Sequence, residues 1–207
     1  DLTIFVYNNS THPFLEGLKI KTKEGDVRNY NSVLKAMRDC DYVYHLVGLT
    51  SVNPDKKKEL FDVNVSGTKN VMKASLKIGI KKVVYVSSTS VLGFSNDEKI
   101  KLTEKDNLEI EDSVYSQSKK LAEYEVQKYI AKGLNATTVI PCSVIGAGEV
   151  VPFVRDLIKS ISSQRIKFTF PGGTSFVAVD DLVDGMILAM EKGKAGQRYI
   201  FSSGYTC

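Results

Sequence analysis

Features that would assign this sequence to several common classes of protein are absent. Its three cysteines, Cys40, Cys142 and Cys207, are an odd number without C-x-x-C spacing, so neither a disulfide framework nor a zinc site is expected. No run of about 18 apolar residues is present, and residues 1–10 lack the basic-then-apolar order of a signal peptide. These absences predict a cytoplasmic protein without a membrane anchor.

An excess of charge of one sign is also missing. The net charge of +4 arises from 28 basic and 24 acidic residues spread along the chain, and the longest basic block is Lys56–Lys58. That block is typical of a solvated helix face, so no nucleic-acid partner is expected. The two histidines, His12 and His45, have no partner at metal-ligand spacing, so we expect no metal site, and His45 is predicted to pack inside a strand.

What is present is the pattern of one soluble α/β domain over residues 1–207. Hydrophobic residues make up 43% and charged residues 25% of the chain, and nothing repeats internally. Short β-branched runs alternate with segments of helical period, which indicates a parallel sheet with helices on both faces. The predicted strands are 2–7, 18–21, 42–47, 83–86, 136–140, 176–179 and 198–201, and the predicted helices are 29–38, 55–79, 113–132, 151–162 and one starting at 180.

Two groups of residues could carry chemistry, and one of them lies at a predicted strand end, where ligands bind in such sheets. Tyr115 and Lys119 are four residues apart on one helix, so they share a face, and a nearby cation stabilises a phenolate. Ser87, Ser88 and Thr89 directly follow the strand 83–86. Each group alone has a simpler explanation, because Tyr-x-x-x-Lys pairs are common on exposed helices and serine runs are common in turns.

In this order and together, these residues resemble the Ser–Tyr–Lys constellation of the extended short-chain dehydrogenase/reductases. The nearest branch is that of dihydroflavonol 4-reductase and 3β-hydroxysteroid dehydrogenase. The motifs that carry the resemblance are Gly25-Asp26-Val27, VYHLVG at 43–48, VNVSGTKN at 63–70, VYVSSTSVLG at 84–93, YSQSKKLAE at 115–123, PCSVIGAG at 141–148 and FVAVDD at 176–181.

The resemblance implies a Rossmann-type doubly wound parallel sheet and a set of site residues. The implied catalytic residues are Ser88, Tyr115 and Lys119, with Lys119 lowering the pKa of the tyrosine. Thr89, the reserve choice for the serine, Cys142 and Ser143 are the implied substrate contacts. The implied cofactor-binding residues are Tyr7, Asn8, Asp26, Val27, Leu46, Val47, Gly48, Asn64, Val86, Tyr115, Lys119, Pro141 and Val144.

The sequence departs from that family in three places. The glycine-rich turn G-x-x-G-x-x-G that receives the pyrophosphate is absent. We therefore expect the first β-α unit and most of the C-terminal substrate-binding part to be missing, with residues ~149–175 on the substrate side. Ala178 replaces the usual histidine. No acid follows the first strand, where Tyr7 stands, and this favours NADP over NAD.

The implied function is hydride transfer between NAD(P) and a ketone or secondary alcohol. A nucleotide-sugar 4-epimerase of the same family is one alternative, whereas Thr89 and Ser90 after Ser88 disfavour a dehydratase, which carries acids there. A non-catalytic NAD(P)-sensing or interaction protein is another, because fold alone does not fix function. The resemblance further implies a homodimer through the helices at 55–79 and 113–132.

Overall fold

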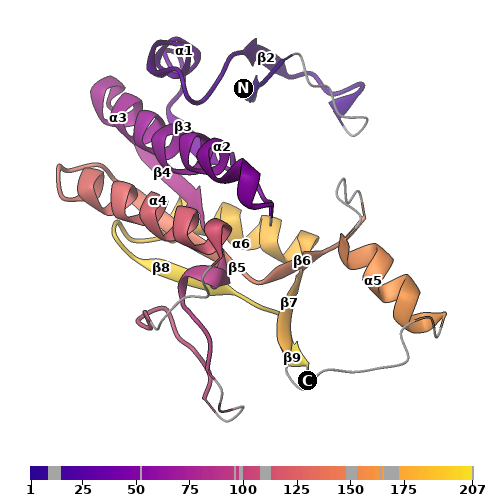
Figure 1. The fold of residues 1–207 in the computed structure, drawn as a ribbon. Helices are drawn as coiled ribbons and strands as arrows, with labels where there is room; N and C mark the ends of the chain where they lie inside the picture. Colours follow the sequence, from indigo (N-terminus) through magenta and orange to yellow (C-terminus); the bar gives the residue numbers. More distant parts are fainter. Residues whose placement is uncertain are drawn as a thin grey trace.

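The computed structural model describes residues 1–8, 15–51, 53–95, 97, 100–107, 113–147, 153–163, 165 and 173–206. Strands and helices alternate along the chain (Figure 1). The strands are β1 Thr3–Val6, β2 Lys21–Glu24, β3 Tyr42–His45, β4 Lys82–Val86, β5 Ala136–Pro141, β6 Ser143–Ile145, β7 Thr174–Ala178, β8 Arg198–Phe201 and β9 Gly204–Thr206. The helices are α1 Tyr30–Ala36, α2 Lys57–Phe61, α3 Thr68–Ile78, α4 Val114–Ile130, α5 Phe153–Ser162 and α6 Val179–Lys192, with short turns η2 Pro54–Lys56, η3 Asp62–Gly67 and η4 Thr89–Val91.

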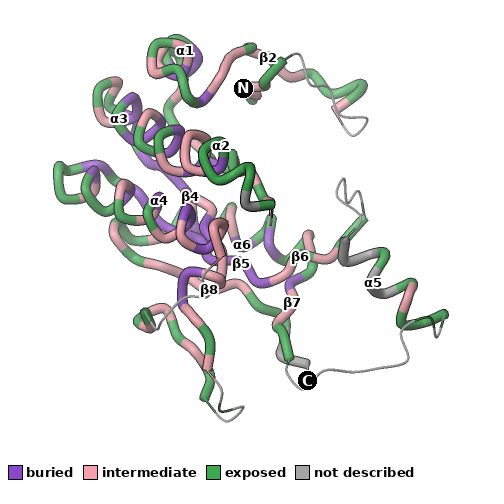
Figure 2. The backbone as a smooth tube through the Cα atoms, in the orientation of Figure 1, coloured by how far each residue is buried: buried purple, intermediate pink, exposed green. Residues whose placement is uncertain are grey.

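The main sheet has the order β3-β4-β5-β8, and all its neighbouring strands are parallel. Its two central strands are buried on both faces, as expected for a parallel sheet covered by helices. Alternation along β4 divides the core: Val83 and Tyr85 face α3 and α4, whereas Val84 faces α6. In Figure 2 the residues coloured as buried gather along β4, β5 and the neighbouring helices.

Residues with defined local preferences set the limits of the helices that carry the site. Ser113 caps the first turn of α4 by accepting a hydrogen bond from the Ser116 amide, and Gly79 ends α3 in a left-handed conformation with φ of 82°. Between α2 and α3, η3 is a π-helical segment, a rare geometry that often occurs at functional sites. This segment places Asn64 under the site.

Strands β1 and β2 form a separate parallel pair. A doubly wound sheet of the Rossmann type has the strand order 3-2-1-4-5-6. The pair β2-β1 and the run β3-β4-β5 have the neighbours and directions of strands 3-2 and 4-5-6 in that order. The predicted fold class, a Rossmann-type doubly wound parallel sheet, is confirmed.

The region after β5 differs from the sequence prediction. Strands β6 and β9 were not expected, and β9 pairs antiparallel with β7, so this small sheet is mixed rather than parallel. The second strand lies at 21–24, instead of 18–21, because its pairing register with β1 starts at Lys21. Within the predicted substrate-side segment ~149–175, residues 149–152, 164 and 166–172 lie outside the described residues, as does Gly148 of the motif before it.

Candidate active site

The predicted Ser–Tyr–Lys residues lie together at the carboxyl end of β4, against the first turns of α4. Ser88 follows β4 at the start of η4, and Tyr115 and Lys119 come from α4. Helix α4 packs on η4 and η3, so the serine turn and the tyrosine helix meet directly. The chain thus brings the three side chains predicted as catalytic to one place.

Ser88 is held by its own turn. Its Oγ accepts hydrogen bonds from the Ser90 amide at 3.3 Å and from the Ser90 hydroxyl at 3.1 Å. A hydroxyl has one proton to donate, and two accepted bonds leave that proton directed elsewhere. Ser88 is therefore arranged to donate to an oxygen in the site, whereas Thr89 starts the 3-10 turn η4.

Tyr115 lies half-buried beside Ser88 and Thr50. Burial raises the pKa of its phenol, and hydrogen bonding with the Ser88 and Thr50 hydroxyls opposes that shift. The resemblance implied that Lys119 lowers this pKa. In the structure the pKa of Tyr115 is raised, and Lys119 is not among the groups that act on it.

The ammonium of Lys119 explains this difference, because it turns inward. Nζ donates to the Val86 carbonyl at 2.8 Å and lies 5.0 Å from the centre of the Tyr85 ring. The side chain is almost completely buried, and desolvation lowers the pKa of Lys119 to about 8, with the negative charge of Glu123 opposing the shift. Because this pKa lies close to neutral pH, the charge of Lys119 responds to small changes around it.

Asn64 joins the loop after β3 to the tyrosine helix. Its Oδ1 accepts from the Leu49 amide at 2.7 Å, and its Nδ2 donates to the Leu49 carbonyl at 3.0 Å and to Ser118 Oγ at 2.9 Å. Ser118 Oγ in turn donates to the Tyr115 carbonyl at 2.7 Å. Asn64 is one of the residues predicted to contact cofactor, and its hydrogen bonds to protein hold the loop after β3 against α4.

Two buried aromatic groups lie under Lys119. His45 bonds through Nε2 to Thr68 Oγ1 at 2.9 Å, and its ring centre is 5.5 Å from that of Tyr85. Burial, with the charge of Lys119, lowers the pKa of His45 to about 3, so it is neutral at physiological pH. The prediction that His45 is a packed strand residue agrees with this burial.

Most other predicted cofactor and substrate residues gather at the same end of the main sheet. Leu46, Val47 and Val144 expose apolar side chains. Gly48 lies beside Asn64 and Lys119, and a Cβ added to this glycine would stand 3.7 Å from Lys119 Nζ. The remaining members are Val86 and Ser143, which are half-buried, and Pro141 and Cys142, which are buried at the end of β5.

The other predicted cofactor residues, Tyr7, Asn8, Asp26 and Val27, lie at the end of the separate β1–β2 pair. Sequence reasoning missed Arg28 there. Its guanidinium binds the Asp26 carboxylate, with Nε 2.8 Å from Oδ2, and donates to the Tyr7 hydroxyl at 3.1 Å. The Arg28 hydrogen bond lowers the pKa of Asp26. An arginine thus stands at the end of the first strand, although it comes from another part of the chain.

Glu123 and Arg198 form a second missed feature, beneath Lys119. Glu123 Oε2 lies 3.3 Å from the Arg198 guanidinium, and both side chains are at least four-fifths buried. Desolvation raises the pKa of Glu123, and Ser87, Arg198 and Lys119 all act to lower it. Glu123 closes the motif at 115–123 that carried the resemblance, and its place four residues after Lys119 was the signal available.

The described residues offer neither a metal site nor a membrane span. Within the described ranges, no group of three or more histidine, cysteine or acidic side chains could hold a metal ion. Among the same residues, no helix has the length and apolar character needed to cross a bilayer.

Comparison with known proteins gives consistent matches over nearly the whole chain. A family model described as "NAD dependent epimerase/dehydratase family" matches residues 2–201. "Sterol demethylase protein B" of Methylococcus capsulatus is 30% identical, with 95% of this chain and 60% of that protein covered. A "putative dihydroflavonol 4-reductase" of Synechocystis is 27% identical, with 90% and 56% covered.

A solved structure shares the fold at low sequence identity. The Bordetella bronchiseptica enzyme WbmH in complex with NAD+ superimposes with a TM-score of 0.80 at 21% identity, covering 98% of this chain and 67% of that one. The chain spans between 42% and 60% of the length of these curated relatives and others like them.

Proposed function

The chain belongs to the NAD dependent epimerase/dehydratase family, and on that premise we propose that it transfers hydride between a nicotinamide cofactor and a ketone or secondary alcohol, like a dihydroflavonol reductase. The observation that carries the proposal is the meeting of Ser88, Tyr115 and Lys119 at the end of β4. The similarity to a putative dihydroflavonol 4-reductase supports the choice of reaction.

In the proposed reaction Tyr115 is the acid and base. During reduction its hydroxyl gives a proton to the carbonyl oxygen of the substrate, and during oxidation its phenolate takes the proton of the alcohol. Ser88, whose acceptor positions Ser90 occupies and whose hydroxyl bonds Tyr115 in this structure, would donate its proton to the same substrate oxygen. The buried ammonium of Lys119 supplies positive charge next to the site. The cofactor supplies or accepts the hydride.

The residues present fit one end of such a cofactor. Lys119 and the glycine backbone of Gly48 would face the nicotinamide ribose, and the exposed apolar side chains of Val47 and Val144 would cover the ring. Asp26 would contact the adenine end. Residues 1–207 offer no equivalent binding site for the pyrophosphate, because this sequence contains no glycine-rich turn that opens a helix.

For the cofactor, dependence on NAD follows from the family, and we propose a preference for NADP. Arg28 lies against Tyr7, so a cation is available where the ribose 2′-phosphate would lie. In this structure the Asp26 carboxylate pairs with the Arg28 guanidinium, so a bound phosphate would have to share that guanidinium with Asp26.

The decisive experiment replaces Tyr115 by phenylalanine in the purified protein. With a panel of secondary alcohols and ketones, and NAD and NADP in turn, we expect turnover to fall by about 10³-fold because the transferable proton is lost. The Kd for cofactor should stay within about twofold. Tyr42→Phe, an exposed tyrosine outside the site, is the matched control. Unchanged turnover in Tyr115→Phe would contradict the assignment.

Two alternatives use the same residues differently. A nucleotide-sugar 4-epimerase returns the hydride it removes, so its steady state shows no net absorbance change of the nicotinamide, whereas the proposed reductase does. A non-catalytic NAD(P)-sensing or interaction protein would bind cofactor but turn over no member of the panel.

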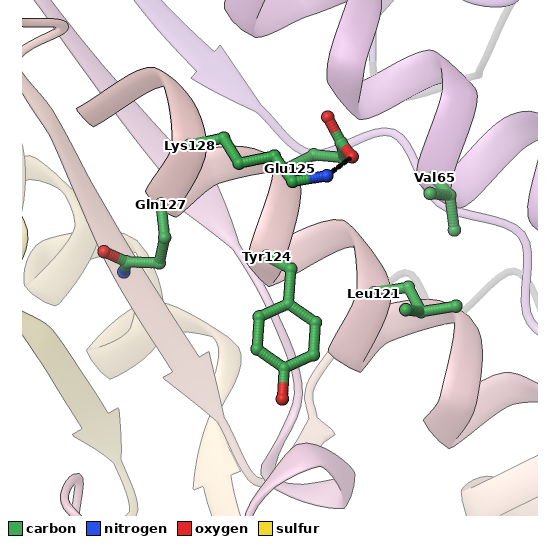
Figure 3. Close-up of a pocket in the computed structure, with 6 residues that line it drawn as sticks. All are labelled: Val65, Leu121, Tyr124, Glu125, Gln127 and Lys128. Carbon is green, nitrogen blue, oxygen red and sulfur yellow. Dashed lines mark hydrogen bonds and ion pairs between the residues drawn. The ribbon is translucent and has the colours of Figure 1, made fainter. Parts of the chain in front are cut away.

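We also propose a homodimer through the outer face of α2, η3 and α4. A cavity of about 420 Å³ opens there, lined by apolar and charged side chains of η3 and α4, with Leu121 and Tyr124 exposed (Figure 3). Exposed apolar side chains at such a surface favour association. Light scattering after size exclusion should give twice the mass of the chain, and Leu121→Asp should give a monomer; a monomeric parent would contradict the proposal.

A further inference from the structure

Several buried side-chain atoms in the interior near Lys119 lack a hydrogen-bond partner. Among the described residues, five buried side-chain nitrogen or oxygen atoms have none, and four of them belong to Tyr85, Ser87, Glu123 and Arg198. These four residues also act on each other's charge: Glu123 and Ser87 affect the pKa of Tyr85, and Ser87 and Arg198 affect that of Glu123. Unpartnered buried polar groups are costly, so their concentration at one place needs a reason.

The helix supplies the geometry. Tyr115, Lys119 and Glu123 follow one another at intervals of four residues along α4, so they form one row on the face turned to the sheet. The Lys119 ammonium is anchored on the site side by the Val86 carbonyl, and the Glu123 carboxylate is anchored on the far side by Arg198 of β8. Lys119 therefore lies between the tyrosine of the site and a buried carboxylate.

The groups around this row leave Glu123 as the compensating charge. From α4, Lys119 faces Glu123; from β4 it faces the neutral ring of Tyr85; and from β3 it faces His45, which is uncharged at physiological pH. Glu123 faces Lys119 and Lys120 on its own helix, Arg198 of β8, and Ser87 after β4. The nearby Ser87 hydroxyl and the three cations all favour the ionised carboxylate, and desolvation opposes them.

We propose that Glu123 is a positioning residue for the reaction: its buried carboxylate, one helical turn from Lys119 and paired with Arg198, is the counter-charge of the Lys119 ammonium beside the site. This inference rests on the proposed function, because that function gives the Lys119 ammonium a part as the positive charge beside the site. No contact of Glu123 with substrate or cofactor is involved.

The direction of the effect follows from the charges. Burial alone lowers the pKa of Lys119, and Glu123 works against burial. Removing the carboxylate therefore lowers the pKa of Lys119 further, below about 8 and into the physiological range. In alcohol oxidation, where a charged Lys119 is needed, the basic limb of the pH profile of kcat should then move to lower pH.

The first test measures Lys119 directly, without cofactor or turnover. The lysine side chains are labelled with ¹³C at Cε, the Lys119 signal is assigned by its loss in Lys119→Met, and its titration is followed by NMR in the parent, Glu123→Gln and Glu191→Gln. We expect Glu123→Gln to lower the apparent pKa by about one unit, a tenfold change in proton affinity. Glu191→Gln, the same change at an exposed position of α6, should leave it unmoved. Glu123→Asp should restore most of the shift.

The second test uses reciprocity and does not need a folded Glu123→Gln variant. If the two groups interact, losing the Lys119 charge must raise the pKa of Glu123 by a similar amount, which a ¹³C titration of the glutamate carboxyls in Lys119→Met would measure. A Lys119 signal that titrates alike in the parent and Glu123→Gln, or a Glu123 signal unmoved in Lys119→Met, would overturn the inference. Absent turnover with both shifts intact would instead count against the proposed function.

Discussion

The main sheet and the β1–β2 pair differ in how far their strands are buried. Strands β4 and β5 are buried on both faces and are enclosed by α3, α4 and α6, whereas β1 is half-buried and β2 is largely exposed. The predicted catalytic residues belong to the first region, and the predicted adenine contacts belong to the second. The predicted catalytic residues are thus held by a packed core, while the predicted adenine contacts rest on a two-stranded pair, which has little stability of its own.

The largest expected effect tests the packing of the first region. Met72 of α3 is fully buried in the core that supports β4, so Met72→Ala should lower the free energy of unfolding by about 2–5 kcal/mol. Leu2→Ala, at an exposed residue before β1, is the control and should change it by less than about 0.5 kcal/mol. Urea denaturation gives both values, and equal losses would remove the contrast between the regions.

A smaller effect is expected at the junction between the loop after β3 and the tyrosine helix. Asn64→Ala removes the hydrogen bonds that Asn64 makes to the Leu49 amide, the Leu49 carbonyl and the Ser118 hydroxyl. We therefore expect the free energy of unfolding to fall by about 2–3 kcal/mol. If Asn64 positions the Tyr115 backbone, kcat should fall more than KM rises. Asn135→Ala removes a single exposed amide bond to a backbone carbonyl and serves for comparison. A change in KM alone would indicate direct cofactor contact instead.

The third prediction has the opposite sign, because the site contains a buried charge. Lys119→Met should stabilise the fold at pH 7 by about 2 kcal/mol. Removing the buried charge removes a cost of roughly 3 kcal/mol, which follows from the lowered pKa of the lysine, and losing the hydrogen bond to Val86 destabilises the fold by about 1 kcal/mol. The cost is fully present below the folded pKa of about 8 and fades as pH rises towards the unfolded value of 10.5. Thermal melts at pH 7 and pH 10 should therefore differ in the size of the gain, and a gain independent of pH would argue against a charged, buried Lys119.

The smallest effect on stability belongs to the second region. Arg28→Ala breaks an ion pair whose partners are about one-third exposed, so the free energy of unfolding should change by less than about 1 kcal/mol. Binding should be more sensitive: if Arg28 receives the 2′-phosphate, calorimetry should show a larger rise in Kd for NADP than for NAD. Lys21→Ala, which breaks an exposed pair with Asp1, is the control. Equal changes for both cofactors would remove the proposed preference.

Local signals were sufficient to predict most of the main sheet. Strand β8 has the predicted bounds, and Gly79 and Ser113 mark helix ends by their own conformational and capping preferences. The short strands β6 and β9 carry no comparable signal, because three residues do not establish a period. Their pairing depends on contacts with β7, which is distant in the sequence from both of them.

The sequence predicted that Ser88, Tyr115 and Lys119 lie together, but it did not predict their contacts. Spacing places Tyr115 and Lys119 on one helix face, yet it does not say that the ammonium turns to the Val86 carbonyl. The pair of Glu123 with Arg198 joins residues from α4 and β8. Such contacts depend on tertiary packing, which the order of residues does not reveal.

The outer edge of β3 has a further consequence for the behaviour of the chain in solution. No described strand pairs with that edge. The segment Tyr42–Val47 contains no proline, aspartate, glutamate, lysine or arginine, and its His45 is buried and neutral. An uncapped edge of β-prone sequence can act as a template for a foreign strand, the first step of amyloid-like assembly. Association of chains through the β3 edge is therefore expected to depend on concentration and to be suppressed by Tyr44→Lys.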